Sequence, residues 1–393
     1  MEHINHANKV KQEKVRVAMV QRVFAPYRRA IFRALATHPL LDFTLLRGAE
    51  DGPGGMKNIE NDPIVKCLVG PTMALPFKER AIYIMPHIVD YARNGDYDVM
   101  IFPNDVYCLS LWPILRAIRK RGKRAVIFSI GFPQYKQWLR DKIRVWLAHK
   151  VDSMVLYSFA HRERFIKCGV PAEKIFVAPN AVDVDAIKAA EANMTAEKLA
   201  EFKKRHNLTD SLNIIHAGRM VDFKQLELLL KAVVKLVKVF DNLKLILIGD
   251  GPMLEQWQQL GHELGIADRI IWPGAIYEQN ELCYWFHSSD ICVAPGQQGL
   301  IANLSHSYGV PLITSDSPRW QGPEIQVFTN GKTGLLYRYA DIDDLAAKIG
   351  KLLRDSDRRK KMGEEARRTI FEDYTTEKMC QGFIDGIMYA MNI

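Results

Sequence analysis

The sequence predicts an α/β fold of two doubly wound, Rossmann-like domains that face a central cleft. Short apolar runs, typical of buried parallel strands, alternate with helical segments along the chain. This alternation occurs in two similar halves, and a polar helical passage at residues 186–210 separates them. A length of 393 residues suits two domains of ordinary size. Ligands of such sheets lie outside the carboxyl ends of the strands.

The first predicted domain spans residues 15–185. Its expected strands are apolar runs at residues 15–20, 41–47, 98–102, 124–129, 154–157 and 175–178. Its expected helices, recognised by helical apolar spacing, lie at residues 31–38, 81–92, 137–149 and 161–168. Residues 1–14 are polar and lack the apolar core of a signal peptide, so we expect a disordered tail there.

The second predicted domain spans residues 211–374. Its expected strands lie at residues 212–217, 243–248, 269–272, 291–294, 312–314 and 334–337. Its expected helices lie at residues 224–240, 253–264, 341–353 and 356–371. A last helix, residues 375–393, could pack back on the first domain.

Composition predicts a chain of the cytoplasm. Hydrophobic residues make up 48% of the chain, charged residues 25%, and no apolar run is long enough to span a bilayer. The six cysteines are scattered without a CxxC or metal-ligand spacing, which predicts reduced thiols.

The net charge of +9 is concentrated in residues 116–150, where Asp141 is the only acid. Aromatic residues lie in or beside this stretch, among them Trp112, Trp138 and Trp146. Basic residues mixed with aromatics suit an anionic membrane surface, which predicts a peripheral position at the inner face of the cell membrane. The alternative is a solvated face whose aromatics belong to the core. No motif supports nucleic acid as a partner.

The stretch ICVAPGQQGLIANLSHSYGVPLIT, residues 291–314, predicts a strand, a glycine-bearing loop, a helix of about ten residues and another strand. Gly296 and Gly299 have no side chain, so a phosphate could come close. The free N–H groups at a helix start favour an anion. We therefore predict a diphosphate site at Gln298, Gly299 and Leu300. The alternative is an ordinary strand-to-helix turn.

Two cations follow the strand at residues 212–217. Arg219 and Lys224 could together neutralise a diphosphate leaving group without a metal, and we expect both at exposed loop ends. The alternative is a surface Arg and Lys. Gly249 and Gly251 form a tight turn after the next strand, but Leu254 replaces the third glycine of a dinucleotide fingerprint. That replacement argues against an NAD site.

A series of motifs carries a family resemblance. They are HAGRMVDFK, LILIGDGP, RIIWPGAIY, DICVAPG, SYGVPLIT, Pro323-Glu324 and NGKTGLLY in the second half, with GVPAEKIFVAPNAVD in the first. In this order and spacing the series resembles the GT-B glycosyltransferases, in particular the large retaining family usually called family 4. The resemblance covers nearly the whole chain from Val15 onward.

The resemblance implies a metal-independent hexosyltransferase that uses a UDP- or GDP-linked sugar as substrate and needs no cofactor. Arg219 and Lys224 would be the catalytic residues that hold the diphosphate. The second domain would bind the donor through Gly218, Gly249, Gly251, Ala275, Ile276, Gln297, Gln298, Gly299, Leu300 and Glu324. The first domain would bind the acceptor, a glycan or a polyprenyl-diphosphate-linked precursor of a bacterial surface polysaccharide such as capsule or O-antigen.

The loop QRVFAPYRR supplies the candidate acceptor residues of the first domain. Arg22, Tyr27 and Arg28 follow a strand and could grip an anionic acceptor. The alternative is a basic helix start that faces solvent. Cations at a helix start oppose the helix dipole, which favours the functional interpretation.

The sequence departs from the family at two positions. The family usually carries two glutamates eight positions apart, and those places hold Gly296 and Leu304 here. The departure leaves three hypotheses open: a divergent transferase, a sugar-nucleotide epimerase of the same fold, and a catalytically silent binding subunit. Asp183-Val184-Asp185 imitates a DxD metal motif, but its PNAVD context matches the family's interdomain segment, so no metal is expected. We interpret His161 as a helix-surface histidine.

Overall fold

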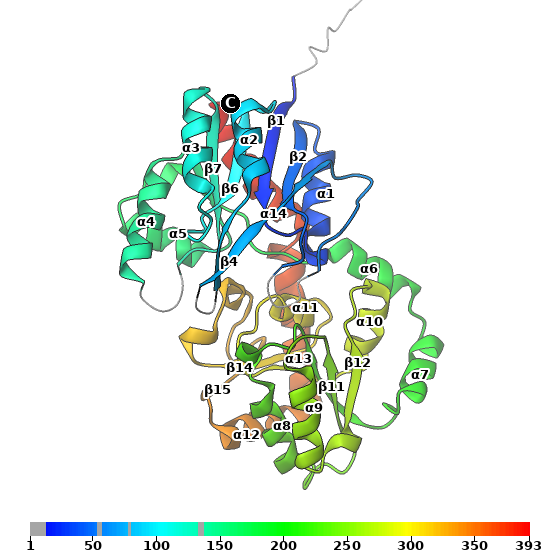
Figure 1. Cartoon of the computed structure of the whole chain (residues 1–393). Helices are drawn as coiled ribbons and strands as arrows, with labels where there is room; N and C mark the ends of the chain where they lie inside the picture. Colours follow the sequence, from blue (N-terminus) through cyan, green and yellow to red (C-terminus); the bar gives the residue numbers. More distant parts are fainter. Residues whose placement is uncertain (1–12, 53–56, 78–79, 133–136) are drawn as a thin grey trace, which may run out of the picture.

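The computed structural model describes residues 13–52, 57–77, 80–132 and 137–393. The predicted disordered tail therefore lies almost wholly outside the described residues. Within them the chain forms two parallel sheets, each with helices on both faces, and these sheets define two domains (Figure 1). This arrangement confirms the predicted fold class of two Rossmann-like, parallel-sheet domains.

In the described chain, the first sheet has the strand order β3-β2-β1-β6-β7-β8-β9. Its strands are β1 (Val15–Gln21), β2 (Leu41–Gly48), β3 (Cys67–Gly70), β6 (Val99–Pro103), β7 (Arg124–Ser129), β8 (Ser153–Leu156) and β9 (Ile175–Val177). Its helices are α1 (Arg29–Thr37), α2 (Pro86–Asn94), α3 (Leu111–Lys120), α4 (Trp138–His149) and α5 (Phe159–Lys167).

The second sheet has the order β12-β11-β10-β13-β14-β15 over the described residues. Its strands are β10 (Leu212–Ala217), β11 (Leu243–Ile248), β12 (Ile270–Gly274), β13 (Ile291–Ala294), β14 (Leu312–Ser315) and β15 (Gly334–Tyr337). The helices from the passage onward are α6 (Val184–Asn193), α7 (Ala196–Arg205), α8 (Leu226–Leu236), α9 (Leu254–Glu263), α10 (Gln279–His287), α11 (Ile301–Ser307), α12 (Ile342–Arg354), α13 (Ser356–Asp373) and α14 (Thr376–Met391).

The expected helix at residues 81–92 is wrong in its first half. Residues Arg80–Ile84 form strand β5, which pairs antiparallel with β4 (Met73–Phe77) in a two-stranded ribbon. Helix α2 begins only at Pro86. Proline suits the first turn of a helix, and it drives the preceding residue, Met85, out of the α region. The proline therefore separates the strand from the helix.

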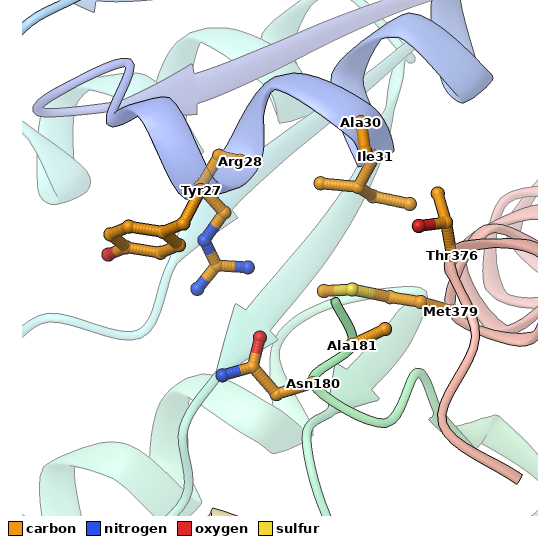
Figure 2. Close-up of a pocket in the computed structure, with 8 residues that line it drawn as sticks. All are labelled: Tyr27, Arg28, Ala30, Ile31, Asn180, Ala181, Thr376 and Met379. Atoms are coloured by element: carbon orange, nitrogen blue, oxygen red, sulfur yellow. The ribbon is translucent and has the colours of Figure 1, made fainter. Parts of the chain in front are cut away.

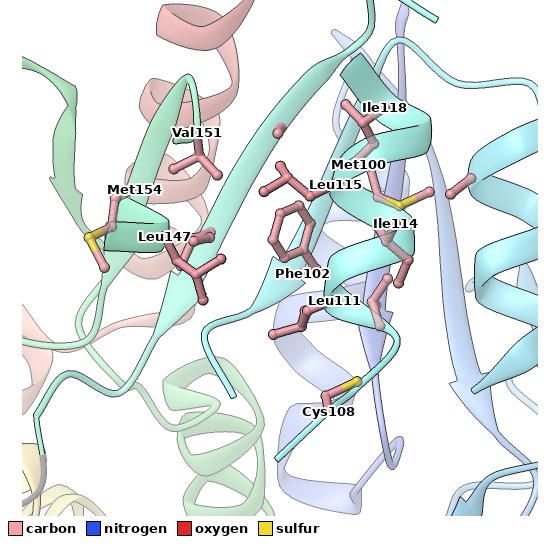
Figure 3. Close-up of a cluster of buried hydrophobic side chains, with 14 of the residues drawn as sticks. Met100, Phe102, Cys108, Leu111, Ile114, Leu115, Ile118, Leu147, Val151 and Met154 are labelled. Atoms are coloured by element: carbon pink, nitrogen blue, oxygen red, sulfur yellow. The ribbon is translucent and has the colours of Figure 1, made fainter. Parts of the chain in front are cut away.

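Successive side chains of β6 point to opposite faces of the first sheet. Met100 and Phe102 pack with α3 and with Leu147 of α4 in one core, shown in Figure 3. Val99 and Ile101 point to the other face, where they join a core formed with α1 and α14. Both faces are apolar because a parallel sheet is covered on both sides.

The C-terminal helix α14 lies on the first sheet, although its sequence follows the second domain (Figure 1). Phe383 and Ile387 are buried in the first domain's core. At Gly382 a Cβ atom would overlap the backbone carbonyl of Val177, so a glycine is needed for this close approach. Helix α6, in contrast, buries Val184 and Ile187 in the core of the second domain.

The strand order creates a topological switch point in each sheet. The chain runs from β10 outward to β12 and then returns to β13 on the other side of β10. The carboxyl ends of β10 and β13 are therefore neighbours at a topological switch point, which is where ligands of such sheets bind. In the first sheet β1 and β6 have the same relationship. Across the described residues, the helices are too short or too polar for any of them to cross a bilayer.

Candidate functional site

The loops that follow β10 and β13 are bonded to each other at the switch point of the second sheet. The N–H of Gly296 donates to the carbonyl of Lys224 at 3.1 Å, and the N–H of Gln297 donates to the carbonyl of Phe223 at 2.9 Å. A Cβ atom on Gly296 would overlap the Phe223 carbonyl oxygen. No other residue fits at position 296 unless the two loops separate.

Lys224 lies inside this pair of loops and not at an exposed loop end, so that expectation is wrong. Its side chain is buried, with 9% of the residue exposed. The ammonium Nζ donates to the carbonyl of Gln297 at 2.6 Å and to the carbonyl of Gln298 at 3.3 Å. These bonds use two of the three ammonium protons. Lys224 thus holds the GQQG loop in shape while its charge remains at the switch point.

Burial lowers the pKa of Lys224 to about 8, because a cation loses hydration in the interior. Glu324 opposes this shift, Arg219 adds to it by repulsion, and Cys292 opposes it weakly. An anion bound beside Lys224 would raise this pKa again. The structure therefore brings Arg219, Lys224, Gln297 and Gln298 together, as the sequence predicts, and adds a strong electrostatic reason for an anion to bind there.

Gln298 is the most unusual polar residue of the site. It is 1% exposed, and in the described chain neither its amide nitrogen nor its amide oxygen has a hydrogen-bond partner. An unpaired buried amide costs about 1–3 kcal/mol. Such a group in a native fold calls for an explanation, and a ligand hydroxyl is one that would fit both its donor and its acceptor. Gln297, in contrast, is only half-buried.

Gly299 and Leu300 precede α11, which has seven residues and is shorter than the expected ten. Gly299 adopts a φ of +55°, a left-handed conformation that favours glycine. A Cβ atom there would lie 3.8 Å from the Lys224 ammonium, so the glycine borders the cation directly. The backbone of Gly299 can therefore approach whatever anion Lys224 holds.

His216 in β10 is a candidate that sequence reasoning missed. It is fully buried, and its Nδ1 lies 2.8 Å from the carbonyl of Val293, which assigns the ring proton to Nδ1. Burial, with repulsion from Lys224, lowers its pKa to about 3, so Nε2 is an unprotonated acceptor. Nε2 has no partner in the described chain. The signal was a single polar residue in the apolar run IIHA, next to Gly218.

The glycine turn after β11 supports the segment that carries Arg219. Gly249 has a φ of +147°, and a Cβ atom there would overlap the carbonyl oxygen of Gly218. A Cβ atom on Gly251 would lie 2.5 Å from the carbonyl oxygen of Met220. These contacts explain both glycines by close packing of two loops. A direct contact of Gly249 or Gly251 with a donor stays a prediction.

The end of β12 carries the residues predicted to meet a nucleotide base. Ala275 is exposed, Ile276 is half-buried, and the ring of Tyr277 is 56% exposed. β12 lies beside β11 and two strands from β10. Their role in base binding stays a prediction.

In the first domain, the candidate acceptor residues follow β1. The Arg22 guanidinium lies 4.7 Å from the centre of the Tyr83 ring, and the Arg28 guanidinium lies 4.8 Å from that of Tyr157. Neither arginine makes an ion pair within the described part of the chain. Arg29 and Arg33 differ, because both pair with the buried Asp62, at 3.6 and 2.9 Å.

Figure 2 shows the surroundings of Arg28. Arg28 and Tyr27 line a small pocket together with Asn180, from the segment between β9 and α6, and Met379 of α14. Its volume of about 10 Å³ holds roughly one water molecule. The pocket is therefore too small for an acceptor, and the exposed Tyr27 ring and the Arg28 cation mark its border.

Two further sequence interpretations concern His161 and the DxD imitation. His161 is not a surface histidine, because it is buried against Gly131 and its Nδ1 lies 3.0 Å from the Ser158 hydroxyl. Asp183 caps α6 by accepting from the N–H of Ala186 at 2.9 Å, and Asp185 points to solvent. Across the described ranges, no three His, Cys, Asp or Glu side chains converge as metal ligands do.

Two family profiles match the chain. The profile described as "Glycosyl transferases group 1" matches residues 198–369, and the one described as "Glycosyltransferase Family 4" matches residues 44–186. The first match includes the switch point of the second sheet with Arg219, Lys224 and the GQQG loop, whereas β1 and the loop that carries Arg22 and Arg28 precede the second match.

Among curated proteins, the chain is similar to a GDP-mannose-dependent alpha-(1-6)-phosphatidylinositol monomannoside mannosyltransferase of Mycobacterium tuberculosis. The two are 25% identical over 244 residues, which is 60% of this chain and 61% of the relative, so the match spans about three fifths of that protein's length. An N-acetyl-alpha-D-glucosaminyl L-malate synthase of Bacillus anthracis is 25% identical over 78% of this chain and 85% of its own.

Solved structures support the fold. Anabaena Alr3699/HepE in complex with UDP superposes with a TM-score of 0.73 at 15% identity, covering 95% of this chain and 99% of the other. A glycosyltransferase from Rickettsia africae superposes with a TM-score of 0.72 at 15% identity, covering 96% and 99%.

Proposed function

This chain belongs to the glycosyltransferases of the GT-B fold and family 4 type, and we infer that it moves a sugar from a nucleoside diphosphate sugar to an anionic acceptor. We propose further that it retains the anomeric configuration, and that the acceptor is a lipid-linked precursor of a bacterial surface polysaccharide. The donor is UDP- or GDP-linked and binds at the ends of β10 and β13.

The observation that carries the proposal is the buried Lys224 beside Arg219 at the switch point. Lys224 is fixed by two carbonyls of the facing loop, so its charge is in place before any ligand arrives. A preorganised cation in a site of low dielectric stabilises the charge that develops on a departing diphosphate. In retaining enzymes of this fold the departing phosphate is thought to help deprotonate the acceptor, so no protein base is required.

The proposed anionic acceptor is supported by Arg22 and Arg28. Each guanidinium lies against an aromatic ring and has no carboxylate partner in the described residues. Each therefore keeps its charge for a phosphate or carboxylate. The relatives' names specify phosphatidylinositol monomannoside and malate, both of which are anionic.

The test combines binding with product analysis. We expect UDP or GDP, but not ADP or CMP, to raise the melting temperature, because a ligand at 100 times its Kd adds about 2.7 kcal/mol to the free energy of unfolding. Radiolabelled UDP- and GDP-sugars are then incubated with lipid extracts. Transfer of label supports the proposal, and isomerisation of the donor would identify an epimerase. Binding without either reaction would identify the silent subunit, which the missing carboxylates at Gly296 and Leu304 keep as an alternative.

Metal independence is the first prediction. Arg219 and Lys224 supply the positive charge for the diphosphate, so we expect EDTA to leave the transfer rate unchanged. The rate is measured with and without added Mg²⁺ or Mn²⁺. A rate that depends strictly on either ion would contradict the assignment and direct attention to Asp183 and Asp185.

A membrane-facing surface forms part of the proposal. Trp138, Lys142 and Trp146 recur at every fourth position of α4 and therefore share one helix face. Trp138 is 68% exposed, and Lys142 Nζ lies 4.9 Å from the centre of its ring. The ring of Trp146 lies 5.6 Å from that of Trp112 on α3, and both are exposed. Exposed tryptophans between basic residues suit the interface of an anionic bilayer.

The second prediction concerns this surface. The double variant Trp138→Ala/Lys142→Glu should lose binding to phosphatidylglycerol vesicles. It removes the exposed ring that would enter the bilayer interface, and it replaces an attracted charge, worth about 1 kcal/mol, with a repelled one. Vesicle sedimentation measures the effect, and binding of the wild type should fall with salt. The matched control Lys238→Glu/Val239→Ala changes exposed residues of the second domain and should sediment like wild type. Equal sedimentation of all three proteins would favour a solvated face.

A further inference from the structure

Glu324 is an unusual carboxylate. In the described chain the buried acids are Asp62 and Glu324, and Asp62 pairs with two arginines. Glu324 is 8% exposed, and no ion pair joins it to a Lys or Arg among the described residues. Its Oε1 accepts from the side-chain amide of Asn180 at 2.7 Å. A buried carboxylate with a neutral partner is costly unless a cation lies nearby.

Asn180 reaches Glu324 from the segment that joins the two domains. It is buried, and its backbone carbonyl accepts a hydrogen bond from the side-chain amide of Asn303, on α11, at 2.8 Å. The same side chain borders the pocket that Arg28 lines in the first domain (Figure 2). Asn180 therefore contacts the acceptor side and fixes a carboxylate on the donor side.

A second bond ties the turn that carries Glu324 to the first domain. The turn is the short 3-10 helix Pro323–Val327, and the side-chain amide of Gln326 donates to the carbonyl of Tyr157 at 2.9 Å. Tyr157 is also the ring beneath the Arg28 guanidinium. The position of the Glu324 carboxylate thus depends on the domain junction being assembled.

Glu324 follows β14, which lies beside β13 in the second sheet, so its turn lies at the same edge of the sheet as Lys224. Among the groups that act on Lys224, Glu324 favours its charged form most, Arg219 disfavours it, and Cys292 has a smaller effect. His216, packed in the neighbouring strand, is neutral. Without Glu324, Lys224 would be a buried lysine beside an arginine, and such a lysine gives up its proton readily.

We propose that Glu324, held by Asn180 across the domain junction, is a positioning residue that keeps Lys224 charged for the donor diphosphate. The proposal rests on the proposed function in one respect, that Lys224 binds the diphosphate. It adds that donor affinity depends on a contact made between the domains, beside the small pocket that Arg28 lines.

The test is the affinity for UDP or GDP, whichever the wild type binds, measured by calorimetry from pH 6.5 to 9. Lys224 is protonated below its pKa, so affinity of the wild type should fall as pH rises through about 8. Glu324→Gln keeps an oxygen for the Asn180 amide but removes the negative charge. We expect the affinity of Glu324→Gln to begin to fall at a lower pH than that of the wild type. At pH 8 its affinity should be lower on the order of tenfold. At pH 6.5 the two proteins should bind more nearly alike.

Two further variants make the outcome decisive. Asn180→Ala leaves the carboxylate in place but unheld, and its pH profile should shift in the same direction. Glu364→Gln makes the same chemical change on an exposed part of α13 and should reproduce the wild-type profile. A loss of affinity in Glu324→Gln that is equal at every pH would indicate a structural role and overturn the proposal. A Glu324→Gln profile identical to that of the wild type would also overturn it. A wild type that binds neither nucleotide would overturn the proposed function as well.

Discussion

Replacing Lys224 with alanine should lower kcat/KM by about 10²-fold or more, because it removes the proposed charge-assisted contact to the leaving diphosphate. It should also lower the melting temperature. The ammonium satisfies the carbonyls of Gln297 and Gln298, and each buried carbonyl left unpaired costs about 1–3 kcal/mol. Steady-state kinetics and thermal unfolding of the same preparation measure both effects.

Arg219→Ala separates the two roles of the cations. Arg219 is half-buried beyond the end of β10, so its removal should reduce kcat/KM to a similar extent with a smaller change in melting temperature. Lys231→Ala, on the exposed side of α8, controls for the loss of a lysine and should behave like wild type. Near-normal turnover by folded Lys224→Ala or Arg219→Ala would contradict the diphosphate assignment.

The burial of Lys224 could not be predicted from the sequence, whereas the strand that precedes it could. The strands β10, β11 and β13 are mainly apolar, because parallel strands are buried on both faces, and such runs are visible locally. Lys224 is buried by Gly296 and Gln297, about seventy residues further along the chain. No local pattern reports a contact of that separation, so a loop lysine was expected to be exposed.

The same reason explains the other differences. The β4–β5 ribbon was missed because an apolar run of five residues before Pro86 fits a strand and a helix equally well until the proline is considered. His161 was assigned to the surface because its burial depends on Gly131, in another loop. The bond between Asn180 and Glu324 joins residues in different domains. Strands and glycine turns are local properties, but burial of a polar side chain is a property of the assembled fold.

The missing glutamates also have a structural reason. At position 296 the backbone N–H is bonded to the Lys224 carbonyl, and a side chain would overlap the Phe223 carbonyl. Leu304 is partly buried against the apolar core that includes Ile301 and Val310, so a carboxylate there would lie against apolar side chains without a prepared partner. Leu304→Glu should therefore not improve activity. We propose that the unpaired amide of Gln298 takes their place.

Gln298→Ala should lower the rate of sugar transfer by about 5- to 150-fold, the equivalent of the 1–3 kcal/mol lost when a substrate hydroxyl is left unpaired. The affinity for the free nucleoside diphosphate should change much less, because the proposed phosphate contacts are those of Lys224 and the backbone near Gly299. The variant loses no hydrogen bond of the folded chain, since the Gln298 amide makes none in the described residues, so any fall in melting temperature should reflect only the cavity that the buried side chain leaves. The measurement is a calorimetric Kd for UDP or GDP beside kcat/KM for transfer.

Gln297→Ala is the matched control for Gln298→Ala. The Gln297 side chain is only half-buried, so water can take its place at a substrate hydroxyl. Its loss should therefore affect transfer less than the loss of Gln298. Two other results would be informative. An equal loss of diphosphate binding and transfer in Gln298→Ala would place its amide on the phosphates instead of the sugar. Wild-type transfer by both variants would show that these amides do not replace the missing carboxylates, and a poorly active wild type would then favour the silent subunit.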